Sequence, residues 1–303
     1  MSLTILQRRA GAELAEAMAD IDSLLEAVER ADGQRPLSDH MWLDLRQGGR
    51  PGFAGLLGVQ EDHDHLVAYC QVSRGNESWS LDLVVHPHHR YEMTTIGPEM
   101  LRAAIDIIRA EGGGHVHWWV FEPTPTYASL AADIGLSPGR TMLQLRVQLP
   151  LAHSTDIETC AFRVGTDEAQ WLEVNNRAFA DHPEQGHWST ETLASRFATR
   201  WFDPKGLLLH HENDQLAGFC WTKLHPDTTP HLGEIYVIAV DPNFARRGLG
   251  RALTIAGLQH LSAEGAPVGM LYVAADNLAA LSLYRSLGFT THHTQRAFVG
   301  DVQ

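Results

Sequence analysis

The sequence of 303 residues contains only three cysteines, which are Cys70, Cys160 and Cys220. They are widely spaced and form no CxxC motif, so a disulfide framework is excluded and reduced thiols are expected. No stretch approaches the roughly 18 consecutive apolar residues of a membrane span. The N-terminal segment carries acidic residues where a secretory signal peptide has its apolar core. The sequence therefore predicts a cytoplasmic protein with no membrane partner.

Basic residues are also scarce, because 23 Lys and Arg stand against 37 Asp and Glu, for a formal net charge of −14. A protein that coats nucleic acid needs an extended basic surface. We therefore expect no nucleic-acid partner. A monomer is also expected. Any phosphate group must be met by a local feature of the chain.

Histidine, in contrast, is plentiful, with 18 copies that include the run HPHH from His86 to His89. None of them is paired at i, i+4 on a helix beside a carboxylate, as in zinc enzymes. Neighbouring residues on a strand point in opposite directions. The spacing therefore predicts no metal site.

The two halves of the chain resemble each other. GLLGVQEDHDHLVAYCQV contains Cys70, and GLLLHHENDQLAGFCWTK contains Cys220 at an offset of 150 residues. Gly135 and Gly288 end similar segments at an offset of 153. The length also exceeds what one hydrophobic core usually serves. We expect two tandem copies of one domain, residues 1–152 and 153–303.

The second copy shows the order of elements most clearly. A helix is expected over 166–180, two strands on either side of HENDQ, and a buried strand over 235–240. A turn and a helix follow, then the strand GMLYVA and the helix NLAALSLYRSL, which Gly288 ends in the left-handed conformation. This order predicts an α/β fold in which each copy is a mixed, mostly antiparallel sheet flanked by helices.

The turn DPNFARRGLGRAL, Asp241–Leu253, is the strongest functional motif. A glycine-rich turn before a helix lets free N–H groups of the first helical turn bind an anion, and the helix dipole adds to the attraction. Gly248 and Gly250 remove side chains that would hold a phosphate away from the backbone. The turn lacks the GxxxxGK[ST] motif and has Leu253 where a dinucleotide fingerprint has its third glycine.

With NLAALSLYRSLGF following, this turn resembles that of the GCN5-related N-acetyltransferases (GNAT), in which it wraps the pyrophosphate of acetyl-CoA. The resemblance implies acetyl-CoA as cosubstrate. It places cofactor contacts on the strand residues Ile238, Ala239 and Val240, on the turn residues Ala245, Arg246, Arg247, Gly248, Leu249, Gly250 and Arg251, and on the helix residues Asn277, Leu278, Ala279, Ala280, Leu281 and Ser282. The family usually has Gln or Arg where this chain has Ala245, so weaker side-chain support is expected there.

Two residues are candidates for proton transfer. Tyr284 matches the tyrosine that the family uses to protonate the departing thiolate, although a helix aromatic at this position also suits a core. Glu234 directly precedes the strand 235–240 and is placed to accept a proton from an amine. A solvated carboxylate at a strand end is the alternative for Glu234.

Segments such as AFADHPEQGHW and GFCWTKLHPD resemble the mycothiol synthase family, which also has two tandem GNAT-like domains. This resemblance covers the whole chain and implies acetylation of the cysteinyl amine of cysteinyl-glucosaminyl-inositol, the last step of mycothiol biosynthesis. The implied substrate contacts are Asp39, Glu184, Lys223, Glu234 and Tyr272. The family tends to have glutamate where this chain has Asp39. Lys223 and Glu184 taken alone would suit surface ion pairs.

The first copy is predicted to be non-catalytic. Its turn, HPHHRYEMTTIGPEM, keeps Arg90 and Gly97 but lacks the GxG pair, and Ala131 stands where the second copy has Tyr284. The resemblance still allows a second, unreactive acetyl-CoA along Leu83, Val84 and Val85. Two alternative functions are open. The same fold could act on another small-molecule or peptide amine, or the chain could be a non-catalytic acyl-CoA sensor.

Overall fold

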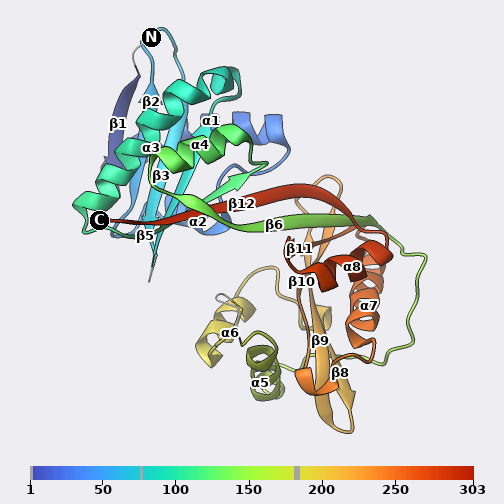
Figure 1. The fold of residues 1–303 in the computed structure, drawn as a ribbon. Coiled ribbons are helices and arrows are strands. Elements are labelled where there is room, and N and C mark those ends of the chain that lie inside the picture. The colour runs from blue at the N-terminus through green and yellow to red at the C-terminus, as the bar shows by residue number, and fades with distance from the viewer. Residues whose placement is uncertain (1–2, 76–77, 181–184) are drawn as a thin grey trace. The chain divides into compact units, whose positions relative to one another are not determined.

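The computed structural model describes residues 3–75, 78–180 and 185–303 (Figure 1). The chain folds into two compact units. Unit 1 comprises residues 1–141 and 294–303, and unit 2 comprises residues 142–293. Across the described residues, no helix combines the length and apolar character needed to cross a bilayer.

In unit 1, a sheet in the order β1-β2-β3-β4-β5-β12 is covered by helices on both faces (Figure 1). The pairings are antiparallel except for β4 with β5. Helices α1 and α2 pack on one face and α3 and α4 on the other. The elements are β1 (Thr4–Arg9), α1 (Ala12–Asp32), α2 (Asp39–Arg46), β2 (Ala54–Val59), β3 (Ala68–Arg74), β4 (Trp79–Val85), the 3-10 helix η1 (Pro87–Glu92), α3 (Met93–Ala110), β5 (Gly114–Phe121), α4 (Pro125–Asp133) and β12 (Thr290–Val302).

Unit 2 repeats this plan with the order β6-β11-β10-β9-β8-β7. Here α5 and α6 pack on one face, and α7 and α8 on the other. The elements are β6 (Ser137–Gln148), β7 (Cys160–Ala161), α5 (Glu168–Ala178), α6 (Thr190–Phe197), η2 (Pro204–Gly206), β8 (Leu207–Glu212), β9 (Gln215–His225), β10 (Leu232–Val240), η3 (Pro242–Phe244), α7 (Leu249–Ala263), β11 (Val268–Ala274) and α8 (Leu278–Ser286). The predicted mixed, mostly antiparallel sheet with flanking helices is confirmed.

The two units differ from the predicted division at residue 152, because each takes its last strand from the other half of the sequence. Residues Met142–Gln148 of β6 pair with β11 in unit 2. Residues Gln295–Val302 of β12 pair with β5 in unit 1. Sequence similarity finds equivalent strands but not their pairing partners, so it could not reveal this exchange.

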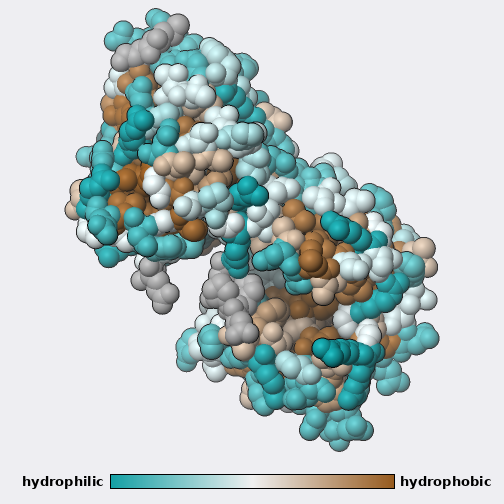
Figure 2. Space-filling model, in the orientation of Figure 1, coloured by the Kyte–Doolittle hydropathy of each residue, from teal (hydrophilic) through white to brown (hydrophobic). Residues whose placement is uncertain are grey.

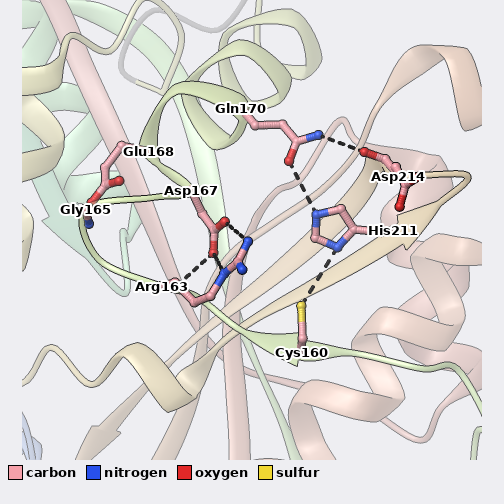
Figure 3. A network of polar contacts seen from close by, with 8 residues as sticks. All are labelled: Cys160, Arg163, Gly165, Asp167, Glu168, Gln170, His211 and Asp214. Carbon is pink, nitrogen blue, oxygen red and sulfur yellow. Dashed lines mark hydrogen bonds and ion pairs between the residues drawn. The ribbon is translucent and has the colours of Figure 1, made fainter.

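A polar network fastens α5 to the sheet of unit 2 (Figure 3). Asp167 precedes α5 and accepts hydrogen bonds from the backbone N–H of Arg163, at 2.8 Å, and from its guanidinium, at 2.7 Å. The bond from Arg163 lowers the pKa of Asp167. Nε2 of His211 in β8 lies 3.4 Å from Oε1 of Gln170 in α5, and Nδ1 of His211 lies 3.8 Å from Sγ of Cys160. These contacts hold α5 against β7 and β8, the last two strands at one edge of the sheet.

Candidate functional site

The turn between β10 and α7 has the conformation that an anion site requires. Gly248 caps α7 with a φ of 80°, a left-handed conformation that favours glycine. Arg246 is also left-handed, with a φ of 63°. The first N–H groups of α7 have no partner inside the helix and carry the positive end of its dipole. The turn that the sequence predicts to bind phosphate thus opens α7 from a left-handed glycine.

The three arginines of this turn have different surroundings. Arg247 donates to Glu212 of β8 at 2.9 Å, and Arg251 donates to the Ser286 hydroxyl of α8 at 2.8 Å. Arg246 is exposed, as is Ala245 before it. Arg247 and Arg251 thus hold the turn against β8 and α8, although the Arg247 side chain is itself 56% exposed.

Strand β10 separates from β11 beside this turn. The parallel pairing covers Leu232–Ile235 against Val268–Leu271, whereas β10 continues to Val240. On the other side of β10, the register with β9 shifts between Ile235 and Val237. Tyr236 is thus a bulged residue, and a bulge bends its strand. The bend opens the sheet between β10 and β11.

The predicted cofactor strand lines this opening. The N–H of Asp241 donates to Ala217 of β9 at 2.9 Å. Backbone groups alternate along a strand, so Ala239 also faces β9 while Ile238 and Val240 face the opening. Their N–H and C=O groups are available to a ligand that lies between β10 and β11, as expected for the pantetheine arm.

Helix α8 supplies a second helix N-terminus. Asn277 caps α8 by accepting a hydrogen bond from the Ala280 N–H at 3.1 Å. Leu278 is 74% exposed, and Ala279 and Ser282 are exposed as well, whereas the side chain of Leu281 is buried. The start of α8 is therefore accessible where the sequence places cofactor contacts, and Leu281 belongs to the core.

Tyr284 packs within the core between α8 and the sheet. Its ring centroid lies 5.7 Å from that of Phe289, and the residue is 7% exposed. Burial raises the pKa of Tyr284 to about 12. The phenol is protonated at neutral pH, as an ordinary tyrosine is, and the raised pKa extends this state to higher pH. The core and catalytic interpretations of Tyr284 are compatible.

Glu234 has a histidine partner that sequence reasoning missed. The residue is 7% exposed, and its Oε2 lies 2.7 Å from Nε2 of His225 at the end of β9. Lys223 is directly opposite Glu234 in the β9–β10 register. Its ammonium lies 5.0 Å from the ring centroid of Trp201 and 5.8 Å from that of Tyr236. Aromatic rings thus hold Lys223 beside the carboxylate.

Tyr272 is held by residues of the exchanged strand β6. Its hydroxyl lies 2.7 Å from Nε2 of Gln144, and Oε1 of Gln144 accepts from Arg146 at 2.8 Å. Burial lowers the pKa of Arg146. Gln144 and Arg146 lie before the predicted boundary at 152, so sequence reasoning did not place them in the second domain.

These residues share one face of the unit 2 sheet. Side chains of paired residues, and of residues two apart, point to the same side. The registers therefore place six residues together, which we call the polar face: Gln144, Arg146, Lys223, His225, Glu234 and Tyr272. The opposite sheet face packs on α7 and α8. The space-filling view shows a hollow over β9 and β10 in which apolar residues gather (Figure 2).

The side chains of two predicted substrate contacts lie outside the described part of the structure. Glu184 lies outside the described residues. Asp39 is the first residue of α2, and its side chain is likewise outside the described part of the structure. Ser38, which precedes it, donates from its N–H and its hydroxyl to Asp82 of β4, both at 3.2 Å. Asp82 thus anchors the start of α2.

Unit 1 repeats part of the strand arrangement of unit 2. Its parallel pairing ends at Leu81 and Trp118, while β4 continues through Leu83, Val84 and Val85. The β3–β4 register, however, runs without a shift. The turn after β4 is a 3-10 helix in which Arg90 forms a bidentate pair with Asp32, at 2.8 and 2.7 Å.

Gly97, the glycine kept in the unit 1 segment, lies inside helix α3. A Cβ there would come within 2.9 Å of the Leu130 side chain, so this glycine serves helix packing. Ala131, which replaces the tyrosine, is buried. Unit 1 therefore lacks a glycine turn and a phenol like those of unit 2.

Comparison with known proteins gives one consistent result. Residues 169–289 match the model of the acetyltransferase (GNAT) family. The mycothiol acetyltransferase of Acidimicrobium ferrooxidans is 40% identical over 287 residues, covering 92% of each chain. Those of Thermomonospora curvata and Streptomyces coelicolor are 41% and 40% identical and cover at least 91% of each chain.

Solved structures show the same fold. A GCN5-related N-acetyltransferase from Sphaerobacter thermophilus has a TM-score of 0.73 at 23% identity, covering 99% of this chain and 96% of its own. A tandem GNAT protein from the clavulanic acid biosynthesis pathway has a TM-score of 0.67 at 15% identity, covering 100% and 99%. At these identities the likeness concerns the fold alone.

Proposed function

Because the chain belongs to the mycothiol acetyltransferase family of GNAT enzymes, we propose that it transfers the acetyl group of acetyl-CoA to the cysteinyl amine of cysteinyl-glucosaminyl-inositol. The observation that carries the proposal is the polar face of unit 2 beside the opening between β10 and β11. An acceptor rich in hydroxyl groups suits the charged and polar hydrogen-bonding groups of this face.

Acetyl-CoA would be bound by the backbone of unit 2. The N-termini of α7 and α8 attract the phosphates, with Arg246 at the edge of the turn. Ile238 and Val240 offer backbone N–H and C=O groups to the pantetheine arm. A backbone N–H facing the thioester oxygen stabilises the negative charge that develops there.

Proton transfer is assigned to Glu234 and Tyr284. Glu234 accepts a proton from the attacking amine, directly or through a water molecule. The amine nitrogen forms a bond to the acetyl carbon as the carbon–sulfur bond breaks. Tyr284 donates its proton to the departing thiolate and regains one from solvent. Glu234 belongs to the polar face, whereas Tyr284 packs on the opposite face of the sheet with α7 and α8.

Acceptor specificity would come from Lys223 and Tyr272, together with Glu184 and Asp39, which the family resemblance implies. Gln144 and Arg146 fix the phenol of Tyr272, and the rings of Trp201 and Tyr236 fix Lys223. We assign catalysis to unit 2 alone, because unit 1 has neither a glycine turn nor a tyrosine at Ala131. A second acetyl-CoA along β4 stays a prediction.

The test offers the purified chain acetyl-CoA together with either the cysteinylated pseudodisaccharide or its uncysteinylated precursor. Release of free CoA thiol and the mass of the product are followed. Acetylation of the cysteinylated form alone is expected. Transfer to unrelated amines without turnover of that form would favour another acceptor, and binding of acetyl-CoA without transfer to any amine would favour a sensor.

A further inference from the structure

Three histidines from two separate segments of unit 1 meet at one place. His63 and His65 lie in the turn between β2 and β3, and His89 lies in η1. One ligand nitrogen from each lies within 4.8 Å of the others. His89 is 2% exposed, and His63 and His65 are half-buried. The sequence spacing predicted no metal site, because it compares positions within a single helix or strand and cannot detect a cluster assembled from two segments.

The hydrogen bonds of two of these histidines define where their protons are. Nδ1 of His89 lies 3.3 Å from Glu92, and Nδ1 of His65 lies 3.3 Å from Asp64. A carboxylate only accepts, so each Nδ1 carries the N–H and donates it. A neutral imidazole has one N–H, so each Nε2 then presents a bare lone pair.

These two bare nitrogens face each other, with 3.2 Å between Nε2 of His65 and Nε2 of His89. Two lone pairs at this distance repel unless a cation lies between them. Zinc–nitrogen bonds of about 2.0–2.1 Å at a tetrahedral angle separate two ligand nitrogens by roughly 3.3 Å. The observed separation fits two nitrogens that share one metal ion.

The surroundings also match a metal centre. Histidine ligands in metalloproteins usually donate their second N–H to a carboxylate, which fixes the ring and raises its basicity. Glu92 and Asp64 are placed to do so. His86 packs beside the cluster, with its ring centroid 4.5 Å from that of His65.

We propose that His63, His65 and His89 bind one divalent transition-metal ion of the class that prefers imidazole, such as Zn²⁺. The ion joins the turn between β2 and β3 to η1. This is the place in unit 1 that corresponds to the phosphate turn of unit 2, since η1 follows β4 as η3 follows β10. The metal site of unit 1 thus corresponds in position to the phosphate turn of unit 2.

The test uses the full-length chain without a histidine tag, freed of metal by a chelator and titrated with ZnCl₂ in a calorimeter. One Zn²⁺ per chain and a rise in the melting temperature of the zinc-loaded protein are expected. His63→Asn, His65→Asn and His89→Asn should each weaken binding at least tenfold, and Glu92→Gln by about 10–100-fold. Co²⁺ bound in place of Zn²⁺ should give the visible absorption bands of a tetrahedral site.

His115→Asn is the matched control, because Nδ1 of His115 also lies beside a carboxylate, 2.8 Å from Asp301. It should leave zinc binding unchanged. Absence of stoichiometric zinc binding overturns the proposal and assigns a shared proton to the His65–His89 pair. Equal binding by the His65→Asn variant overturns it too. If the buried His89→Asn variant fails to fold, the half-buried positions His63 and His65 carry the test.

Discussion

Nε2 of His225 lies 2.7 Å from Oε2 of Glu234, at the point where β9 and β10 present both side chains on the same face. The bond fixes the orientation of a carboxylate that is almost excluded from solvent. A general base works only when it is held within reach of the proton it removes. His225 is therefore assigned as a positioning residue for Glu234.

Replacement of His225 tests this assignment. His225→Ala should lower kcat about tenfold with little change in the KM for acetyl-CoA, since a well-placed general base is worth about 10²–10⁴-fold and Glu234 is still present. His225→Gln keeps an N–H donor and should recover part of the rate. Steady-state kinetics of both variants give the readout. Equal losses in the two variants, or a loss confined to the KM for acetyl-CoA, would argue against positioning.

Tyr284→Phe should lower kcat by about 10²-fold or more, because the thiolate then leaves without its proton donor. The substitution keeps the packing against Phe289, so the melting temperature should change little. Because burial raises the pKa of Tyr284 to about 12, the native enzyme should keep its rate near pH 10, where an ordinary tyrosine is half ionised. A decline of kcat with an apparent pKa near 10 would count against the raised pKa, and an unchanged kcat in Tyr284→Phe would count against Tyr284 as the acid.

Gly248→Ala should weaken acetyl-CoA binding. The added methyl group projects from a left-handed position in the turn that must approach the pyrophosphate. Gly265→Ala is the matched control, because Gly265 also has a positive φ, of 90°, and an added Cβ at either glycine meets no atom within 4 Å. Both variants should lose similar stability, but only Gly248→Ala should raise the Kd for CoA in calorimetry. Equal affinities in the two variants would remove the turn from the cofactor site.

Asp82 makes the stability of unit 1 depend on pH. Burial raises the pKa of Asp82 to about 7, above the value of about 3.9 in an unfolded chain. The folded state then holds a proton that the unfolded state releases, so the free energy of unfolding should fall as the pH rises from about 4 to about 7. Asp82→Asn should remove this dependence of the free energy of unfolding on pH. Urea unfolding of both proteins across this range measures it, and parallel pH profiles would refute the assignment.

Local patterns predicted the parts of the site that come from one stretch of sequence. The turn with Gly248, the buried strand β10 and the capped helix α8 are all continuous segments with their own periodicity and turn residues. The bulge at Tyr236 was not predicted, because it is defined by the register of β10 against β9. The contacts His225–Glu234 and Gln144–Tyr272 join residues of different strands, and the second depends on the exchange of β6 between the two halves of the sequence.

The most direct test of Glu234 as the base is the pH dependence of Glu234→Gln. An α-amine has a pKa of about 8, so at lower pH the acceptor is mostly charged and depends most on a base. The kcat/KM for the cysteinylated acceptor is measured for native and Glu234→Gln protein between pH 6 and about 9. A deficit that is largest at low pH and shrinks as the amine loses its proton is the predicted result. Full activity of Glu234→Gln at every pH would contradict the mechanism.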